Sequence, residues 1–229
     1  MKIHRFYVDE PLPNKGRYDV EDTKVIHHAA DVVRLRSGEP IALFNGVMEV
    51  IGEVDVCAKR ELSLHIQRVL HEDKRKEVVL YQSIVKGDHM DLIVEKTTEV
   101  GVTRIVPLIS DRTIKTGLRL DRMQRIAIEA SEQSGRIAVP TVSDIMSLRE
   151  AIVDAKKQGY RICVCDFSSK QLHLRTDDVP MAIFVGPEGG WSDAERALFE
   201  AESIQLVSLG NTVLRAETAA IVSVYLCAQ

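Results

Sequence analysis

The second two thirds of the chain alternate short apolar runs with segments of helical periodicity, and this alternation constrains the fold most strongly. The runs are residues 78–85, 104–108, 161–165, 181–185 and 204–209. Helical patterns occupy residues 88–100, 121–134 and 147–158, a further helix starts at Ser192, and the last spans 217–227. Strands separated by helices predict an α/β fold, a parallel sheet with helices on its faces.

The first 70 residues follow a different pattern. Asn45-Gly46 lies between two apolar runs and predicts a hairpin whose two turn positions both need positive φ. In the second run Val50 and Val54 face one way and Glu49 the other, as in a half-buried antiparallel strand. With further strands at 3–8 and 62–70, we expect a small, mostly β, barrel-like domain.

The polar sequence HEDKRKE at 71–77 is the expected domain boundary. We therefore assign residues 1–72 to the first domain and 73–229 to the second.

Composition narrows the class of protein. The chain has 229 residues, a net charge of −4 and no run of 18 apolar residues, so neither a membrane-spanning helix nor a signal peptide is expected. Its 4 cysteines fit no zinc or disulfide spacing. They predict reduced, buried thiols, a cytoplasmic protein and no metal site.

Two glycine-marked turns, GPEGG at 186–190 and LGNTVLR at 209–215, each follow an apolar run and lead into a helix. Loops at the carboxyl ends of buried strands are where α/β proteins bind ligands. These two turns are therefore the best candidate for a site.

The first turn does not suit a phosphate. The spacing from Ser192 to Glu195 predicts a capping box, and the start of that helix favours anions. However, no phosphate-loop lysine follows, and Glu188 would repel a phosphate. A ligand with a neutral or cationic head fits better, and a rigid turn without any ligand stays open as the alternative.

The second turn combines apolar walls with open backbone groups. Leu209 and Leu214 suit a flat aromatic base such as adenine. Arg215 and Glu217 begin the last helix. Glu217 could simply complement the helix dipole, and a salt bridge of Arg215 to Glu217 or Glu188 is as good an interpretation as a substrate role.

Residues 104–125 form a locally basic segment on an acidic protein. The cations are Arg104, Arg112, Lys115, Arg119, Arg122 and Arg125, against Asp111 and Asp121. Such a segment either receives an RNA backbone or is a solvated surface without a partner.

The motifs resemble a known family. Residues 184–192, FVGPEGGWS, and 209–219, LGNTVLRAETA, are similar to the two signature blocks of the ribosomal RNA small subunit methyltransferase E family, which belongs to the SPOUT methyltransferases. Lys86-Gly87-Asp88 with the EK at 95–96, the segment 129–136 followed by Pro140, and HRFY at 4–7 extend the resemblance over nearly the whole chain.

The resemblance implies a PUA-like β-barrel that helps to hold RNA, followed by a SPOUT domain with a C-terminal trefoil knot. It implies that the two turns cradle S-adenosylmethionine, that the protein is a homodimer, and that N3 of one uridine in 16S ribosomal RNA of the small subunit is methylated.

Site residues follow from the motifs and from the chemistry of the base. Because uridine N3 carries a weakly acidic proton, the enzyme needs a base, a group that stabilises the anion, or both. We assign Arg215 to the anion or to positioning of the substrate, and Glu217 to the base, with Glu188, Glu132 and Gln133 as further polar candidates. The expected cofactor residues are Val185, Gly186, Glu188, Gly189, Gly190, Leu209, Gly210, Leu214 and Thr218. The expected RNA contacts are Arg5, Lys86, Lys96, Arg112, Gln133 and Arg136.

Three alternatives stay open: a ribose 2′-O-methyltransferase of the same fold, an RNA-binding assembly protein without catalysis, and a nucleotide-binding enzyme that uses the first turn for phosphate.

Overall fold

The chain divides into two compact units. The computed structural model describes residues 3–72, 75–114, 117–169 and 179–229. One unit comprises Met1–Lys74 and Ser131–Val139, and the other comprises Arg75–Ala130 and Pro140–Gln229. The segment 131–139 thus belongs to the first unit. The boundary expected near residue 72 places this segment in the second domain.

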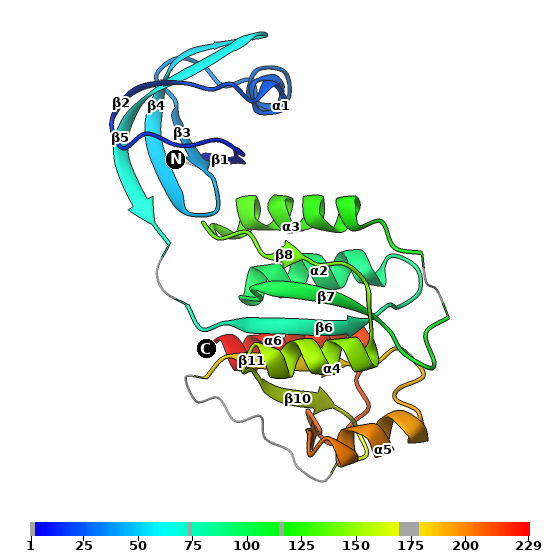
Figure 1. Cartoon of the computed structure of the whole chain (residues 1–229). Helices are drawn as coiled ribbons and strands as arrows, with labels where there is room; N and C mark the ends of the chain where they lie inside the picture. Colours follow the sequence, from blue (N-terminus) through cyan, green and yellow to red (C-terminus); the bar gives the residue numbers. More distant parts are fainter. Residues whose placement is uncertain (1–2, 73–74, 115–116, 170–178) are drawn as a thin grey trace. The chain divides into compact units, whose positions relative to one another are not determined.

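The first unit contains a five-stranded sheet in the order β1-β3-β4-β5-β2 (Figure 1). Its strands are β1 (His4–Tyr7), β2 (Gly16–Asp19), β3 (Pro40–Phe44), β4 (Met48–Ala58) and β5 (Glu61–His71). The β1–β3 pair is parallel and the others are antiparallel. Helix α1 (Thr23–His27) continues into the π-helix η1 (His28–Val33). Apolar side chains of the sheet and α1, including Phe6, Leu43, Val50 and Leu64, form one core.

The predicted hairpin between β3 and β4 is confirmed, but its turn is shifted by one residue. Phe44 pairs with Glu49, and Asn45 N donates to Met48 O at 3.2 Å. Gly46 and Val47 are therefore the central residues, and only Gly46 (φ 89°) has positive φ. Asn45 instead accepts hydrogen bonds from the backbone of the turn through Oδ1, the local bonding that favours asparagine in turns.

Glu49 does not face solvent as the alternation predicts. It is buried and pairs with Arg5 at 2.6 Å between Oε1 and Nε. A register shift between Ile51 and Gly52 interrupts the strand's regular alternation nearby. A buried carboxylate is tolerated here because its charge is matched.

The second unit is a parallel sheet covered by helices, which confirms the predicted α/β class. Its described strands are ordered β12-β10-β11-β6-β7-β8, with β9 also paired to β7. They are β6 (Val78–Ser83), β7 (Arg104–Ile109), β8 (Thr141–Val142), β9 (Met146–Ser147), β10 (Arg161–Cys165), β11 (Met181–Val185) and β12 (Gln205–Val207). The helices are α2 (His89–Val100), α3 (Leu120–Ser134), α4 (Leu148–Lys157), α5 (Asp193–Ala201) and α6 (Ala216–Ala228), and the end of α3 from Ser131 onward belongs to the first unit. The sequence does not predict β2, β8 and β9, which have four residues or fewer.

Three neighbouring strands bring their loops to one edge of this sheet. Strands β12, β10 and β11 are adjacent and parallel, so their carboxyl ends lie together. The loop after β10 begins at Asp166, the loop after β11 at Gly186, and the loop after β12 at Ser208. Helix α6 packs on β6, β11 and α2. This packing holds the first residues of α6 near the same edge.

On the last helix Tyr225 is 51% exposed. The buried face carries Ala216, Ala220, Val224 and Cys227, spaced three or four residues apart, and Tyr225 lies off that face. None of the described helices is both long and apolar enough to span a membrane.

Candidate active site

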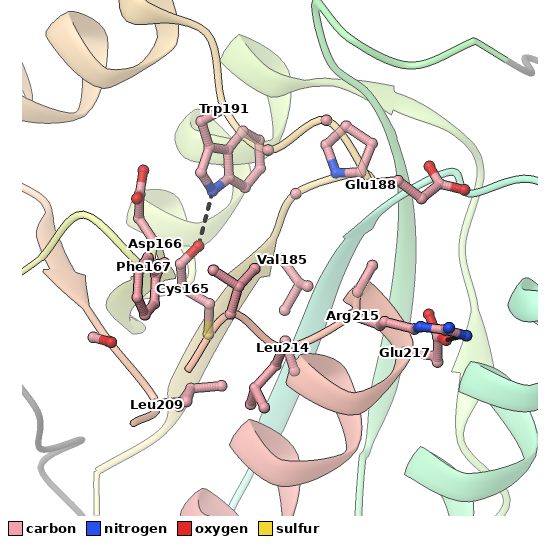
Figure 2. A pocket seen from close by; sticks show the side chains of 18 of the residues that line it. Cys165, Asp166, Phe167, Val185, Glu188, Trp191, Leu209, Leu214, Arg215 and Glu217 are labelled. Atoms are coloured by element: carbon pink, nitrogen blue, oxygen red, sulfur yellow. Dashed lines mark hydrogen bonds and ion pairs between the residues drawn. The ribbon is translucent and has the colours of Figure 1, made fainter. Parts of the chain in front are cut away.

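Both glycine turns line one cavity of about 600 Å³ at the carboxyl edge of the sheet (Figure 2). The remaining lining comes from residues 165–167 after β10, from the start of α6, and from His89 at the start of α2. The sequence prediction that the two turns form one site is therefore matched by a single shared cavity.

The first turn needs glycine for two different reasons. Gly190 has φ 65°, which strains a residue with a side chain, and its N–H donates to Pro187 O at 2.8 Å. At Gly186 a Cβ would lie 3.2 Å from the Trp191 ring, so the close approach of this ring requires the absence of a side chain. Pro187 and both glycines therefore define the shape of this wall.

Trp191 fixes the first turn to the loop after β10. It is only 1% exposed, and its Nε1 donates to Cys165 O at 3.0 Å (Figure 2). Its ring meets Phe199 edge to face, with 5.1 Å between the ring centroids. The predicted capping box follows at once, with Ser192 and Glu195 exchanging side-chain and backbone hydrogen bonds. Tryptophan and cap together start α5 directly at the edge of the cavity.

The loop after β7 braces the same turn from outside. Arg112 donates to Gly189 O at 2.6 Å, and Asp111 N donates to Glu195 Oε1 at 2.9 Å. Ser192 Oγ also hydrogen-bonds the Asp111 carboxylate. Arg112, expected to contact RNA, therefore already uses part of its guanidinium within the protein.

Glu188 is held at the mouth of the cavity by the loop after β6. Its Oε1 accepts from Lys86 N at 2.9 Å. Burial raises its pKa, but this hydrogen bond and the positive charge of Lys86 outweigh burial, so the pKa lies below the ordinary value. The carboxylate is thus charged at neutral pH, in agreement with the prediction that this turn does not suit phosphate.

The second turn is held by few internal contacts. Ser208 Oγ donates to Gly210 O at 2.8 Å. The backbone N–H groups of residues 209–214 donate to no other described residue. Val213 is 73% exposed although it lines the cavity. This wall therefore presents apolar side chains together with unused backbone donors.

A third group lies where α6 begins. Arg215 is the N-cap of α6, and its side chain is 82% exposed. Its NH1 lies 4.0 Å from Glu217 Oε1, while His89 Nδ1 lies 3.4 Å from the same oxygen. The Glu217 side chain is 12% exposed, and its Oε1 is the atom that both exposed side chains approach.

Asp166 and Phe167 are cavity residues that the sequence analysis missed. Asp166 is buried and accepts from Arg196 Nε and Ser168 N, each at 2.8 Å. Burial raises its pKa, but these hydrogen bonds prevail and the net pKa is lowered. The available signal is position: both residues follow the strand 161–165, and His89 likewise opens the helix after the strand 78–83.

Most predicted cofactor residues lie on the cavity wall, namely Val185, Gly186, Glu188, Gly189, Gly190, Leu209 and Leu214. Gly210 and Thr218 are not among the described lining residues, and Thr218 points to solvent on α6. Cys165 also lines the cavity, where burial raises the pKa of its thiol. The described residues hold no cluster of three His, Cys, Asp or Glu suited to a metal ion.

The predicted RNA contacts divide into engaged and exposed side chains. Arg5 donates to Glu49 and to the carbonyls of Ser131, Glu132 and Arg136, and Arg136 itself is buried. Lys96 pairs with Glu95 and Glu99 at 2.8 Å. By contrast, Lys86 and Gln133 are exposed. Arg5 and Arg136 therefore stabilise the first unit and do not present an open cationic surface.

The basic segment 104–125 is mostly paired with acidic residues. The pairs are Arg104–Asp154 at 2.7 Å, Arg119–Asp121 at 2.9 Å, Arg122–Asp91 at 2.5 Å and Arg125–Glu129 at 3.7 Å. Lys115 lies outside the described residues. The local charge that favoured an RNA surface is largely balanced by these partners.

Comparison with known proteins extends these observations. Residues 72–228 match the sequence family described as RNA methyltransferase domain. The structure of a ribosomal RNA small subunit methyltransferase E from Neisseria gonorrhoeae bound to S-adenosylmethionine is 34% identical, covers 97% of this chain and 95% of its own, and has a TM-score of 0.88. A Legionella pneumophila structure with bound S-adenosylmethionine is 28% identical, with coverages of 98% and 96% and a TM-score of 0.86.

An α/β unit of this topology with this cavity is that of an RNA methyltransferase. A ribosomal RNA small subunit methyltransferase E from Aquifex aeolicus is 31% identical over 232 residues, covering 96% of each chain. The chain belongs to the ribosomal RNA small subunit methyltransferase E family.

Proposed function

We propose that the protein transfers the methyl group of S-adenosylmethionine to N3 of one uridine in 16S ribosomal RNA. The observation that carries this proposal is the single cavity formed by both signature turns, in a chain closely similar to a methyltransferase with this cofactor bound. Arg215 and Glu217 border the same cavity, so the proposed uridine site is continuous with the proposed cofactor site (Figure 2).

The cavity residues fit the cofactor. The volume of about 600 Å³ lies within the ordinary range for cofactor pockets. Leu209 and Leu214 would cover the adenine, and the unused backbone N–H groups of 209–214 would bind its edge. Glu188, charged at neutral pH, and Asp166 would complement the positive charges of the methionine portion.

Among the remaining predicted cofactor residues, Val185, Gly186, Gly189 and Gly190 supply backbone and close approach on the first wall. Gly210 would act through its place in the second turn, and Thr218 has the weakest support because it points to solvent.

S-adenosylmethionine supplies an electrophilic methyl group, and the protein must make uridine N3 nucleophilic. Loss of the N3 proton places negative charge on the imide and its two oxygens. The exposed guanidinium of Arg215 is free to approach those oxygens, because its nearest recorded carboxylate contact is 4.0 Å long. Such a donor strengthens as the charge develops.

The RNA itself would be held by exposed groups. Lys86 and the unbonded part of Arg112 belong to the same unit as the cavity. Phosphate contacts of this kind position RNA without reading its sequence, and the target base must leave its stack to reach the methyl group. Lys96, Arg5 and Arg136 have less support as direct contacts, because they are paired or buried within the protein, whereas Gln133 is exposed.

We also propose the finer architecture that the resemblance implies: a PUA-like barrel in residues 1–72, a SPOUT domain with a trefoil knot in 73–229, and a cytoplasmic homodimer. The knot is supported by the shared cavity of the two turns beside α6. The dimer is supported by exposed apolar side chains on α6 and α2, Tyr225, Leu226 and Leu92. Light scattering of the intact protein tests the dimer, which a monomeric mass contradicts.

The decisive test is methylation of unmethylated small ribosomal subunits by Arg215→Ala protein. Because Arg215 is exposed and caps no backbone group, folding and binding of S-adenosylhomocysteine should be retained. We expect the turnover rate to fall about 10²–10³-fold, as for loss of a donor to a developing anion. Near-normal turnover rules out the assignment of Arg215.

Mass spectrometry of the nucleosides separates the proposed reaction from its nearest rival, because N3-methyluridine and a 2′-O-methylated nucleotide fragment differently. Calorimetry with S-adenosylhomocysteine and with ATP separates the proposed methyltransferase from a nucleotide-binding enzyme and from a non-catalytic RNA-binding protein. Binding of ATP alone indicates a nucleotide enzyme, and binding of neither ligand indicates a non-catalytic RNA-binding protein.

A further inference from the structure

The wall of the cavity contains a histidine that the proposed chemistry has not used. His89 is the first residue of α2, where the chain leaves the loop after β6. It lines the same cavity as Arg215 and Glu217, and its side chain is 45% exposed. It is also the only histidine of the second unit that the structure describes.

Glu217 is the carboxylate next to this histidine. Its Oε1 lies 3.4 Å from His89 Nδ1, and helices α2 and α6, which carry the two residues, pack on each other. When Nδ1 carries the proton shared with Glu217, Nε2 retains its lone pair. This is the arrangement of a carboxylate that fixes the tautomer of a catalytic imidazole. Contacts of this kind are often long before substrate binds.

The chemistry favours the imidazole over the carboxylate as proton acceptor. An ordinary glutamate titrates near ~4.3 and an ordinary histidine near ~6.5, so histidine is the better base for a weakly acidic N–H near neutral pH. Glu217 is mostly buried between His89 and Arg215, whereas His89 is open to the cavity and to solvent. The carboxylate is therefore better placed to orient a base than to reach the substrate.

Resting on the methyl transfer proposed above, we propose that His89 Nε2 accepts the N3 proton of the target uridine, with Glu217 as its positioning residue. The proton moves from N3 to Nε2, the electron pair of the N–H bond stays on the imide, and N3 then bonds to the methyl carbon. The bond from that carbon to sulfur breaks, leaving neutral S-adenosylhomocysteine. The imidazolium, stabilised by Glu217, returns its proton to solvent.

Other charged groups face His89 and enter the pH dependence. Glu217 approaches from α6, while Glu188 and Lys86 approach from the loops beside it. Asp88 and Asp91 lie on its own element. Arg215 NH1 lies 4.0 Å from the same oxygen of Glu217. The variants below leave all of these groups except Glu217 in place.

The test measures single-turnover methylation of unmethylated small subunits against pH, at saturating S-adenosylmethionine, for the intact protein and for His89→Gln. At neutral pH we expect a loss of roughly 10²-fold or more. The wild-type rate should rise with pH and then reach a plateau. The variant should lack this plateau and continue to rise into the alkaline range, where the imide ionises without help.

Two further variants separate a catalytic role from a structural one. His89→Ala should regain rate when imidazole is added to the solution. Glu217→Gln should lose less rate than His89→Gln and keep the plateau. The matched control is His27→Gln, which removes an exposed histidine with an analogous carboxylate contact to Asp31 at 2.7 Å and should leave the pH profile unchanged.

A His89→Gln rate within about twofold of wild type, or a variant pH profile that coincides with the wild-type profile, overturns this inference and leaves the methyl transfer itself standing. Wild-type protein that produces no N3-methyluridine overturns the proposed function, and the inference falls with it. Retained binding of S-adenosylhomocysteine and an unchanged circular dichroism spectrum show that each variant is folded.

Discussion

The two turns that form the cavity are held in very different ways. The turn at 186–191 is fixed by the buried Trp191, by Arg112 on Gly189 and by Lys86 on Glu188. Within the turn at 208–215 one side-chain hydrogen bond forms, from Ser208 Oγ to Gly210 O, and Val213 is exposed. The difference indicates that the first wall is prearranged, whereas the second has groups left over for a ligand to bind.

This contrast predicts that damage to the first wall lowers stability and damage to the second lowers affinity. The largest expected effect follows from Trp191→Ala. Loss of a fully buried tryptophan should lower the free energy of unfolding by about 3–5 kcal/mol. Urea unfolding followed by circular dichroism measures it, because the variant loses the chain's single tryptophan as a fluorescent probe.

Trp191→Phe provides the matched control. It keeps an aromatic ring but not the hydrogen bond to Cys165 O, and a smaller loss is expected. A Trp191→Ala loss below about 1 kcal/mol would show that the first wall is not held by its tryptophan.

Gly186→Ala should have the next largest effect. The new methyl group would lie 3.2 Å from a ring that is itself anchored, and we expect a loss of about 1–3 kcal/mol by overpacking. Thermal unfolding measures it. Gly190→Ala separates the causes, since a Cβ there meets no atom within 4 Å and adds only the strain of φ 65°. Equal losses of stability in the two variants would show that the close approach of the Trp191 ring is not the reason for glycine at position 186.

Val213→Ser should affect the cofactor and not the fold. Because Val213 is exposed, the free energy of unfolding should change by less than about 0.5 kcal/mol. If a ligand covers this side chain, its affinity should fall by about 1 kcal/mol, roughly fivefold. Calorimetry with S-adenosylhomocysteine measures the affinity. Equal affinity of variant and wild type would show that the cofactor does not cover this part of the second turn.

The smallest effect is expected at Glu188→Gln. The exposed carboxylate accepts one backbone hydrogen bond, which the amide oxygen of glutamine can also accept, so only the charge is lost and the cost should be about 0.5 kcal/mol. The pKa of Glu188 is lower in the folded protein than the ordinary 4.5, so its contribution is fully present above that value. It disappears as the pH falls below 4.5 through the folded pKa. The stability difference between wild type and variant should shrink over that range, and a constant difference contradicts this account.

Local sequence signals predict much of this fold because their physics is local. The capping box at Ser192 depends on residues three apart, and the glycines that end α2, α3 and α4 each have positive φ. The parallel sheet follows from short apolar runs that alternate with helices. The predicted position of the turn at Asn45 is wrong by one residue. Asn-Gly can occupy the two central positions of a hairpin turn, or, as here, the position before the centre and the first central position.

Other features depend on partners far away in the chain. Glu49 is buried because Arg5, 44 residues distant, neutralises it. Asp166 lines the cavity because Arg196 and the parallel pairing of β10 with β11 bring it there. His89 meets Glu217 only after α2 and α6 pack together. No periodicity within a strand or helix carries such information. The position of Asp166 and His89 after a strand marks them as candidates, but it does not identify their partners.

The return of residues 131–139 to the first unit bears on how the protein is made and dissected. Arg5 binds the carbonyls of Ser131, Glu132 and Arg136, and Tyr7 N donates to Glu132. Arg5 and Ser131 are 126 residues apart in the sequence. A ribosome that synthesises this chain therefore releases β1 long before the carbonyl groups that Arg5 binds. A fragment cut at residue 72 would leave the Arg5 guanidinium without these carbonyls, so the amino-terminal unit is not a contiguous module that can be excised or transplanted alone.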